Sequence, residues 1–232
     1  MRMITPSPPG GSVDLLSRTV AQYLAQSFSG IVHVGDIPLL LVVHPSVAAT
    51  SVRELIALAK ARPGHLQFAA GAAGGGPSMA GLLFRQSAGI DTVQVAYKGN
   101  APALTDLLGG QVTMMFDTIN TSSALAKAGR LRALAVTSTM RSSLAPELPT
   151  MIEAGLPGFD VRAWFAVMAP ARTPRDIVQK LNAEINHALN DPTIRTRLSA
   201  DGIELVGGTP AEIDAFIRAE MARWPKIIKA TD

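Results

Sequence analysis

Cysteine is absent from the 232 residues of this chain. Its absence excludes disulfide scaffolds, thiolate metal sites and cysteine nucleophiles, and it leaves the cellular compartment open. Aromatic residues make up only 5% of the sequence, so there is no stacking platform for single-stranded nucleic acid. The longest apolar runs, such as residues 39–43, are far shorter than the roughly 20 residues of a membrane-spanning helix. We therefore expect no insertion into a membrane.

The charge of the chain is slightly positive and is spread along the sequence. There are 21 Lys and Arg residues against 18 Asp and Glu, and the basic residues are scattered near predicted helix ends, as at Lys60 and Arg62. A nucleic-acid-binding protein would gather this excess into a stripe, so we expect no nucleic-acid partner. Hydrophobic residues make up 47% of the chain, which is enough for a buried core and excludes a disordered chain.

Short β-rich runs alternate with helical runs, a pattern typical of an α/β fold with mostly parallel strands. The predicted strands cover residues 3–5, 39–43, 66–70, 92–96, 112–116, 131–137 and 164–169. Helices are predicted over residues 13–28, after Ser51, around Leu82, and over residues 101–108 and 123–128. Hydroxyl or acidic N-caps predict where the helix after Ser51 begins and where three further helices begin, at Thr173, Asp191 and Thr209.

Three predicted strand-to-helix turns are rich in small residues, and they are the most informative feature of the sequence. They contain Gly10-Gly11-Ser12, Gly74–Ser78 and Gly99-Asn100. Unpaired amides and the helix dipole make a helix start favourable for an anion, and glycine lets a ligand approach the backbone closely. A single turn of this kind needs no ligand to explain it, but several turns at one crevice predict a carboxylate or phosphate site.

Other kinds of site find no support in the motifs. There is no Gly-Lys-Ser/Thr and no Gly-x-Gly-x-x-Gly spacing, which argues against nucleotide binding. A Gly-x-Ser-x-Gly elbow is also missing, and His187 with Glu184 is the one histidine that has suggestive company on a helix. We therefore expect no catalytic residue, no metal and no cofactor. Asp14 and Asp117 each follow an apolar strand, where α/β proteins place ligand groups.

Several motifs in this order resemble the tripartite tricarboxylate transporter receptor family, the Bug-type periplasmic solute-binding proteins. They are Pro8–Asp14, Tyr97–Ala103, Leu107–Val112, Gly129–Thr137, Glu153–Gly158 and Trp164-Phe165. The resemblance implies a two-domain Venus-flytrap fold in the periplasm, without catalysis. The implied partners are a small carboxylate and the membrane permease subunits of a transporter, and we expect the receptor to be a monomer.

The resemblance also implies the ligand-binding residues, which are Gly10, Gly11, Ser12, Asp14, Gly71, Ala72, Gly75, Ser78, Tyr97 and Asp117. It places residues 1–42 and 163–232 in domain 1 and residues 43–162 in domain 2, with the chain crossing near Val42 and Ala163. Residues 1–30 show no basic-then-apolar leader, so we expect an export signal to have been removed or never present.

The sequence departs from this family in two places. Hydrogen-bonding residues of the relatives are replaced by Ala70, Ala73, Gly75, Gly76 and Pro77, with Ser78 in place of a histidine, so ligand identity does not transfer. Gly30 also runs straight into Ile31, where relatives have on the order of 50–70 more residues in further βα units. We expect an omitted segment, and hence a spatial break, at this point. An enzyme acting on an organic acid, or an effector-sensing module of a regulator, stays open as an alternative.

Overall fold

The computed structural model describes residues 28–72 and 74–229, which divide into two α/β units. We call residues 38–163 the central unit, and residues 28–37 with 164–229 the terminal unit. Strands β1 (Phe28–Val43) and β6 (Arg162–Pro170) belong to both units. The α/β fold class predicted from the sequence is confirmed, while the predicted domain bounds stay a prediction. The predicted strand at residues 3–5 and all but the last residue of the predicted helix at residues 13–28 lie outside the described residues.

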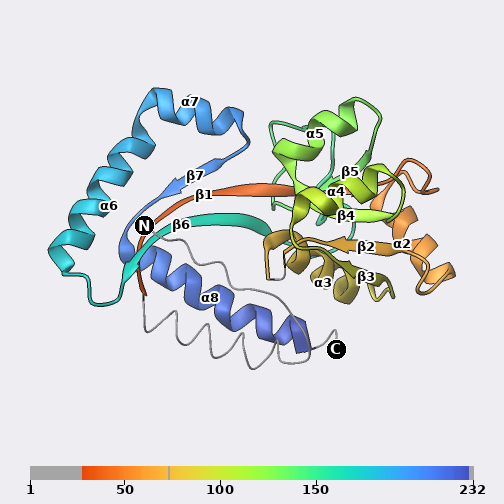
Figure 1. Cartoon of the computed structure of the whole chain (residues 1–232), viewed down its shortest axis with the longest axis horizontal. Helices are drawn as coiled ribbons and strands as arrows, with labels where there is room; N and C mark the ends of the chain where they lie inside the picture. Colours follow the sequence, from red (N-terminus) through yellow and green to blue (C-terminus); the bar gives the residue numbers. More distant parts are fainter. Residues whose placement is uncertain (1–27, 73, 230–232) are drawn as a thin grey trace. The chain divides into compact units, whose positions relative to one another are not determined.

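The central unit is built on a sheet with the strand order β3-β2-β4-β1-β5 (Figure 1). Its further strands are β2 (Gln67–Ala70), β3 (Val93–Ala96), β4 (Met114–Thr118) and β5 (Arg132–Val136). Strand β2 is parallel to both β3 and β4, whereas β1 is antiparallel to β4 and β5. Four strands therefore run in one direction and end at one edge of the sheet, which we call the carboxyl edge.

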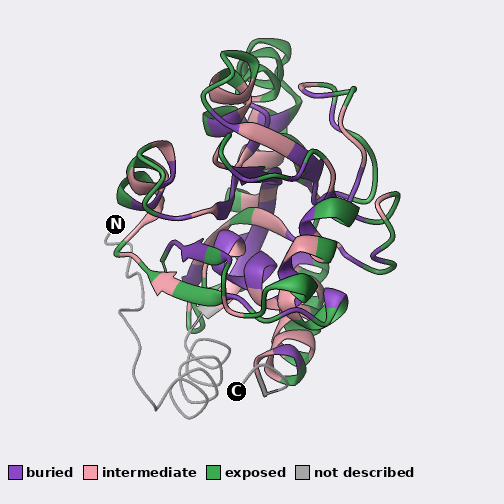
Figure 2. Ribbon diagram, turned by 90° about the vertical axis from the view of Figure 1, so that its right-hand side faces the viewer, coloured by how far each residue is buried: buried purple, intermediate pink, exposed green. Residues whose placement is uncertain are grey.

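Helices connect these parallel strands and cover the sheet. They are α2 (Val52–Ala61), α3 (Gly76–Ala88), α4 (Asn100–Leu108) and α5 (Ile119–Lys127). Figure 1 shows α4 and α5 on one side of the sheet and α3 on the other, as right-handed crossovers require. The core between them contains Phe116, whose ring centroid lies 5.9–6.3 Å from those of Phe68, Phe84 and Phe159. In Figure 2 the buried residues concentrate along the strands and on one face of the helices.

The terminal unit places the first part of β1 in the middle of a small sheet. Strand β7 (Glu204–Gly207) pairs with it in antiparallel register, and β6 also pairs with it. The helices are α6 (Arg175–Asn190), α7 (Pro192–Ala200) and α8 (Pro210–Lys229). Buried side chains of β1, β6 and α6 form the core, and a buried His33–Asp36 pair with 2.6 Å between Nε2 and Oδ1 lies beside it.

Three of the four predicted helix caps are confirmed. The Glu54 amide donates to Ser51 Oγ, Asp191 accepts from the amides of Thr193 and Ile194, and the Glu212 amide donates to Thr209 Oγ1. The cap predicted at Thr173 is wrong, because α6 begins one residue later, after Pro174. The Thr173 amide donates instead to the Pro170 carbonyl and so belongs to the turn that follows β6.

The spatial break expected between Gly30 and Ile31 is also wrong. Both residues lie inside β1, which continues without interruption from Phe28 to Val43. The Gly30 amide donates to Asp214 Oδ1 at 3.0 Å, and Ile31 is 2% exposed in the core of the terminal unit. Burial and hydrogen bonding on both sides of this peptide bond therefore hold the two residues in one strand.

Candidate ligand-binding site

Three neighbouring helices of the central unit begin at the carboxyl edge of the sheet. Strands β2, β3 and β4 are adjacent and parallel; β2 and β3 lead through short connections into α3 and α4, and β4 continues directly into α5. The three helix starts therefore share this edge, which is where ligands bind in open α/β sheets. Figure 1 shows the connections from β2 and β4 on the same side of the central unit.

None of these three helix starts has a side-chain cap or an acidic residue in its first turn, in the part of the chain that the structure describes. The N-cap residues Gly75, Gly99 and Thr118 make no side-chain cap hydrogen bond, and the first turns contain no acidic residue. By contrast, α2 has Ser51 and Glu54, and α7 has Asp191 as its cap. Uncapped amides and three helix dipoles at one edge favour the binding of an anion.

A buried carboxylate ties the connections together. Asp117, near the end of β4, is 1% exposed and accepts hydrogen bonds from Asn100 Nδ2 at 3.2 Å and Ser122 Oγ at 2.6 Å. Asn100 is the first residue of α4, and Ser122 lies in α5. Gly71 allows this arrangement, because a Cβ at that position would collide with the Asn100 side chain. Asp117 therefore links the first turns of α4 and α5, and its carboxylate is shielded from the surface.

The predicted ligand-binding residues either lie at the carboxyl edge of the sheet or fall outside the described residues. Gly71, Ala72, Gly75 and Ser78 lie in the connection after β2 or in the first turn of α3, at the same edge as Asp117. Ser78 is 4% exposed, whereas Ala72 is exposed. Ala73 and the predicted residues Gly10, Gly11, Ser12 and Asp14 lie outside the described residues.

Tyr97 follows β3 at this edge and donates its hydroxyl to Asp106 Oδ2 at 2.7 Å. This hydrogen bond is the main reason that the pKa of Tyr97 is raised above its ordinary value, and burial and the charge of Asp106 act in the same direction. An ionised Tyr97 would lose the hydrogen bond and face a second negative charge.

Replacing Asp106 with asparagine is accordingly expected to lower the pKa of Tyr97 toward its ordinary value. The chain has two tyrosines, so a Tyr23→Phe background isolates the phenolate absorbance of Tyr97 in an alkaline titration. An unchanged pKa in Asp106→Asn would show that the hydrogen bond does not control the ionisation of this residue.

Two residues of this network, Asn100 and Ser122, were missed as site residues by sequence reasoning. Asn100 was visible as a polar residue at a predicted helix start, which is a signal that could have identified it. Ser122 carries no such signal, because it lies inside a predicted helix and its partner Asp117 is on the strand that precedes this helix.

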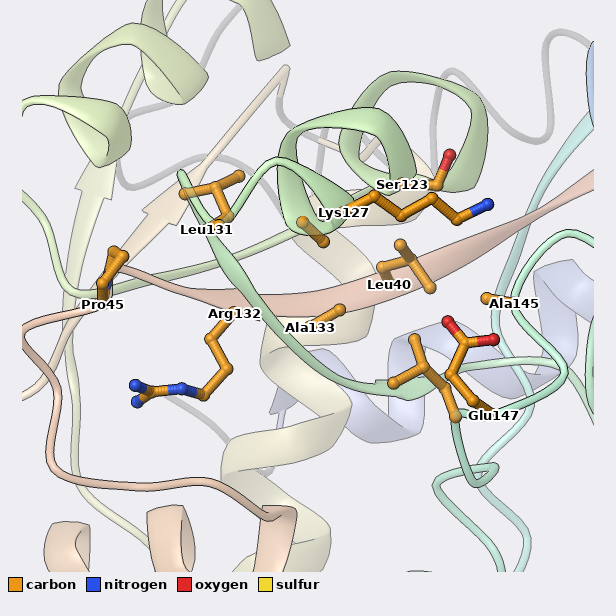
Figure 3. Close-up of a pocket in the computed structure, with 12 residues that line it drawn as sticks. Leu40, Pro45, Ser123, Lys127, Leu131, Arg132, Ala133, Ala145 and Glu147 are labelled. Atoms are coloured by element: carbon orange, nitrogen blue, oxygen red, sulfur yellow. The ribbon is translucent and has the colours of Figure 1, made fainter.

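A separate hollow of about 340 Å³ lies between α5, β5 and the loop at residues 145–148. Figure 3 shows Lys127 and Glu147 at its rim and apolar side chains such as Leu40 and Leu131 beside them. It contains none of the predicted site residues. We therefore assign the candidate site to the carboxyl edge, where the uncapped amides are.

Metal binding and membrane spanning find no support in the described ranges. No group of three or more His, Cys, Asp or Glu residues within residues 28–72 and 74–229 could hold a metal ion. None of the helices in those ranges has the length and apolar character needed to cross a bilayer.

The fold consists of two α/β units that share two strands, and its helix starts offer free amide donors at one sheet edge. This arrangement is typical of periplasmic solute-binding proteins. Residues 19–232 match the family described as tripartite tricarboxylate transporter family receptor, and the chain belongs to this family. The predicted family is thus confirmed. It is a family of solute receptors and not of enzymes, as expected.

Relatives with known sequences and structures agree with this assignment. A UPF0065 protein encoded in the tcbD–tcbE intergenic region of Pseudomonas sp. strain P51 is 38% identical over 88% of this chain. Rpa4515 of R. palustris, solved with adipate, is 37% identical with a TM-score of 0.82 and covers 89% of the chain. MatC of Rhodopseudomonas palustris, solved with bound malate, is 29% identical with a TM-score of 0.78 over 87% of the chain.

The chain is shorter than these relatives. It spans 61% of the Pseudomonas protein and 69% of both Rpa4515 and MatC. The alignment with BugT of Bordetella pertussis (strain Tohama I), 32% identical, covers all 232 residues of this chain and 89% of BugT, yet extends over 289 positions. BugT therefore contains several dozen residues that have no counterpart here.

Proposed function

We propose that this protein is a periplasmic receptor that binds a small organic carboxylate reversibly and delivers it to the permease subunits of a tripartite tricarboxylate transporter. The receptor acts as a monomer and leaves the carboxylate chemically unchanged. Membership of the receptor family supports the transport role, and the adipate and malate bound to two relatives support the ligand class.

The observation that carries this proposal is the set of three uncapped helix starts. Within the described residues, α3, α4 and α5 present first-turn amides at one sheet edge with no acidic residue and no side-chain cap. A carboxylate satisfies such amides as a side-chain cap would, and its charge is stabilised by the helix dipoles. Because the connection after β2 has few hydroxyls, we propose that backbone amides provide most of the donors.

The first loop is proposed to complete this site. Gly10, Gly11 and Ser12 precede a predicted helix and offer further amides and a hydroxyl to the same ligand. Asp14 would accept from an amide or a water, since direct contact between two carboxylates is repulsive. We propose that the ring of Tyr97 provides part of the apolar lining around the ligand and that Ser78 provides part of the polar lining.

A thermal-shift screen tests the function on the full chain. Mono-, di- and tricarboxylates are compared with their methyl esters, which keep the carbon skeleton and remove the charge. A true ligand at a hundred times its Kd is expected to stabilise the fold by about 2.7 kcal/mol and to raise Tm, whereas its ester is expected to lose most of this shift.

Two results would contradict the proposal. One is a shift of Tm by uncharged compounds and by no carboxylate. The other is recovery of the bound acid in a chemically altered form, which mass spectrometry of the ligand after incubation would reveal and which would indicate an enzyme.

A further inference from the structure

The hollow between α5, β5 and the loop at residues 145–148 lies within the central unit and is distinct from the carboxyl edge. Its volume of about 340 Å³ falls at the lower end of the range of roughly 300–1,000 Å³ that ligand pockets have. The lining includes the buried side chains of Leu40 and Leu131, while Ala126 and Ala133 leave space because they are small. Size and lining therefore suit a small ligand with an apolar body.

Hydrogen bonds hold the loop that forms one wall of the hollow. The Leu148 amide donates to the Ala145 carbonyl at 3.1 Å, and the Ala145 amide donates to the Ser142 carbonyl at 3.1 Å. Arg141 Nη1 donates to the Pro146 carbonyl at 3.3 Å from outside the loop's turns. The wall is thus ordered without a ligand, so binding in the hollow pays little for ordering this part of the chain.

Two opposite charges at the rim are available to a ligand. Lys127 comes from the last turn of α5 and Glu147 from the loop, and both side chains are exposed. Within the described residues, the Glu147 carboxylate has no hydrogen-bond or ion-pair partner, and Lys127 Nζ reaches the Leu144 carbonyl at the long distance of 3.5 Å. The guanidinium of Arg132 is used elsewhere, because it donates to two backbone carbonyls of the segment after β1. Figure 3 shows it pointing away from Lys127 and Glu147.

We propose that this hollow binds a small zwitterion with an aliphatic side chain, such as an aliphatic amino acid. Its carboxylate meets Lys127, its ammonium meets Glu147, and its side chain lies on the apolar lining. A simple anion would face Glu147 and the carbonyl end of α5, which carries partial negative charge, and a simple cation would face Lys127. Only a ligand with both charges avoids these unfavourable pairs. The inference concerns a second site and does not depend on the proposed function.

A nuclear magnetic resonance titration of the full chain with L-leucine tests this assignment. The amides of Gly129 and Leu148 report on the hollow, and those of Gly75 and Asn100 report on the carboxyl edge. Leucine is expected to shift the first pair. Two analogues share its skeleton: 4-methylpentanoate lacks the ammonium, and 3-methylbutylamine lacks the carboxylate. Each is expected to bind in the hollow about fivefold more weakly than leucine, and glycine, which lacks the aliphatic side chain, is also expected to bind more weakly.

Two charge variants are expected to act on different analogues. Lys127→Gln is expected to weaken leucine and 4-methylpentanoate about fivefold and not to weaken 3-methylbutylamine. Glu147→Gln is expected to weaken leucine and 3-methylbutylamine by a similar factor and not to weaken 4-methylpentanoate. Arg130→Gln is the matched control, because Arg130 is an exposed cation beside the hollow that does not line it. It is expected to change each affinity by less than about twofold.

Three results would overturn the assignment. Leucine leaves the amides of Gly129 and Leu148 unshifted, leucine binds there no better than its two analogues, or either charge variant weakens all three probes alike. Failure of the proposed function is a separate result, in which no carboxylate of the screen shifts the amides of Gly75 and Asn100, whatever happens at the hollow.

Discussion

Replacing Asp117 with alanine is expected to lower the free energy of unfolding by about 3 kcal/mol and to weaken carboxylate binding. The substitution leaves Asn100 Nδ2 and Ser122 Oγ without their acceptor, and an unsatisfied buried donor costs about 1–3 kcal/mol. Binding falls because Asp117 links the first turns of α4 and α5 at the proposed site. Urea unfolding measures the first effect, and calorimetric titration with the best ligand of the screen measures the second.

Two further variants serve as controls for Asp117→Ala. Asp117→Asn keeps one acceptor oxygen and is expected to lose less stability than Asp117→Ala. Asp91→Ala removes an exposed aspartate from the same unit and is expected to stay within about 0.5 kcal/mol of the wild type. A loss of less than that amount in Asp117→Ala would mean that the network does not hold the site together.

Gly81→Ala is expected to destabilise the protein by about 1–3 kcal/mol, although alanine normally favours a helix over glycine. Gly81 lies inside α3, and a Cβ there would collide with the ring atoms Cζ and Cε1 of Phe68. Phe68 is 1% exposed and packs edge-on against Phe116, so its ring has no free space to enter. Thermal or urea unfolding of the variant shows whether its free energy of unfolding is lower than that of the wild type.

A matched glycine and a compensating change make this test specific. Gly109→Ala at the end of α4 places its Cβ in ordinary contact, 3.6 Å from the Thr105 carbonyl, and is expected to change stability by less than about 0.5 kcal/mol. Adding Phe68→Leu to Gly81→Ala is expected to cost less than the sum of the two single changes, because both act on the same space. Strict additivity would refute the collision.

Local sequence signals were sufficient for much of the fold. Alternating apolar runs located the strands of the central unit to within two residues at most ends, and the hydroxyl and acidic caps at Ser51, Asp191 and Thr209 located helix starts. These signals work because a strand's period and a cap's partner both lie within a few residues. The cap at Thr173 failed because α6 begins one residue later than predicted, at Arg175, and Thr173 belongs to the turn after β6, where its amide donates to the Pro170 carbonyl.

The candidate site was only partly predictable for the opposite reason. Glycine-rich helix starts are visible in the sequence, and so is the place of Asp117 after an apolar strand. The contact with Asn100 is not visible, because Asn100 reaches Asp117 only once β3 and β4 are placed on either side of β2. Ser122 reaches Asp117 across the turn from β4 into α5, and the sequence does not show which way either side chain points.

Strand β1 belongs to both sheets, and this affects how the protein unfolds. This strand of 16 residues has hydrogen-bonded neighbours on both sides in each sheet, β4 with β5 and β6 with β7. Loss of β1 from either sheet removes an inner strand, so its amides can exchange with solvent only when most of that sheet has come apart. Hydrogen exchange along β1 therefore reports the cooperative unfolding of both units, whereas the outer strand β3 reports local fraying alone.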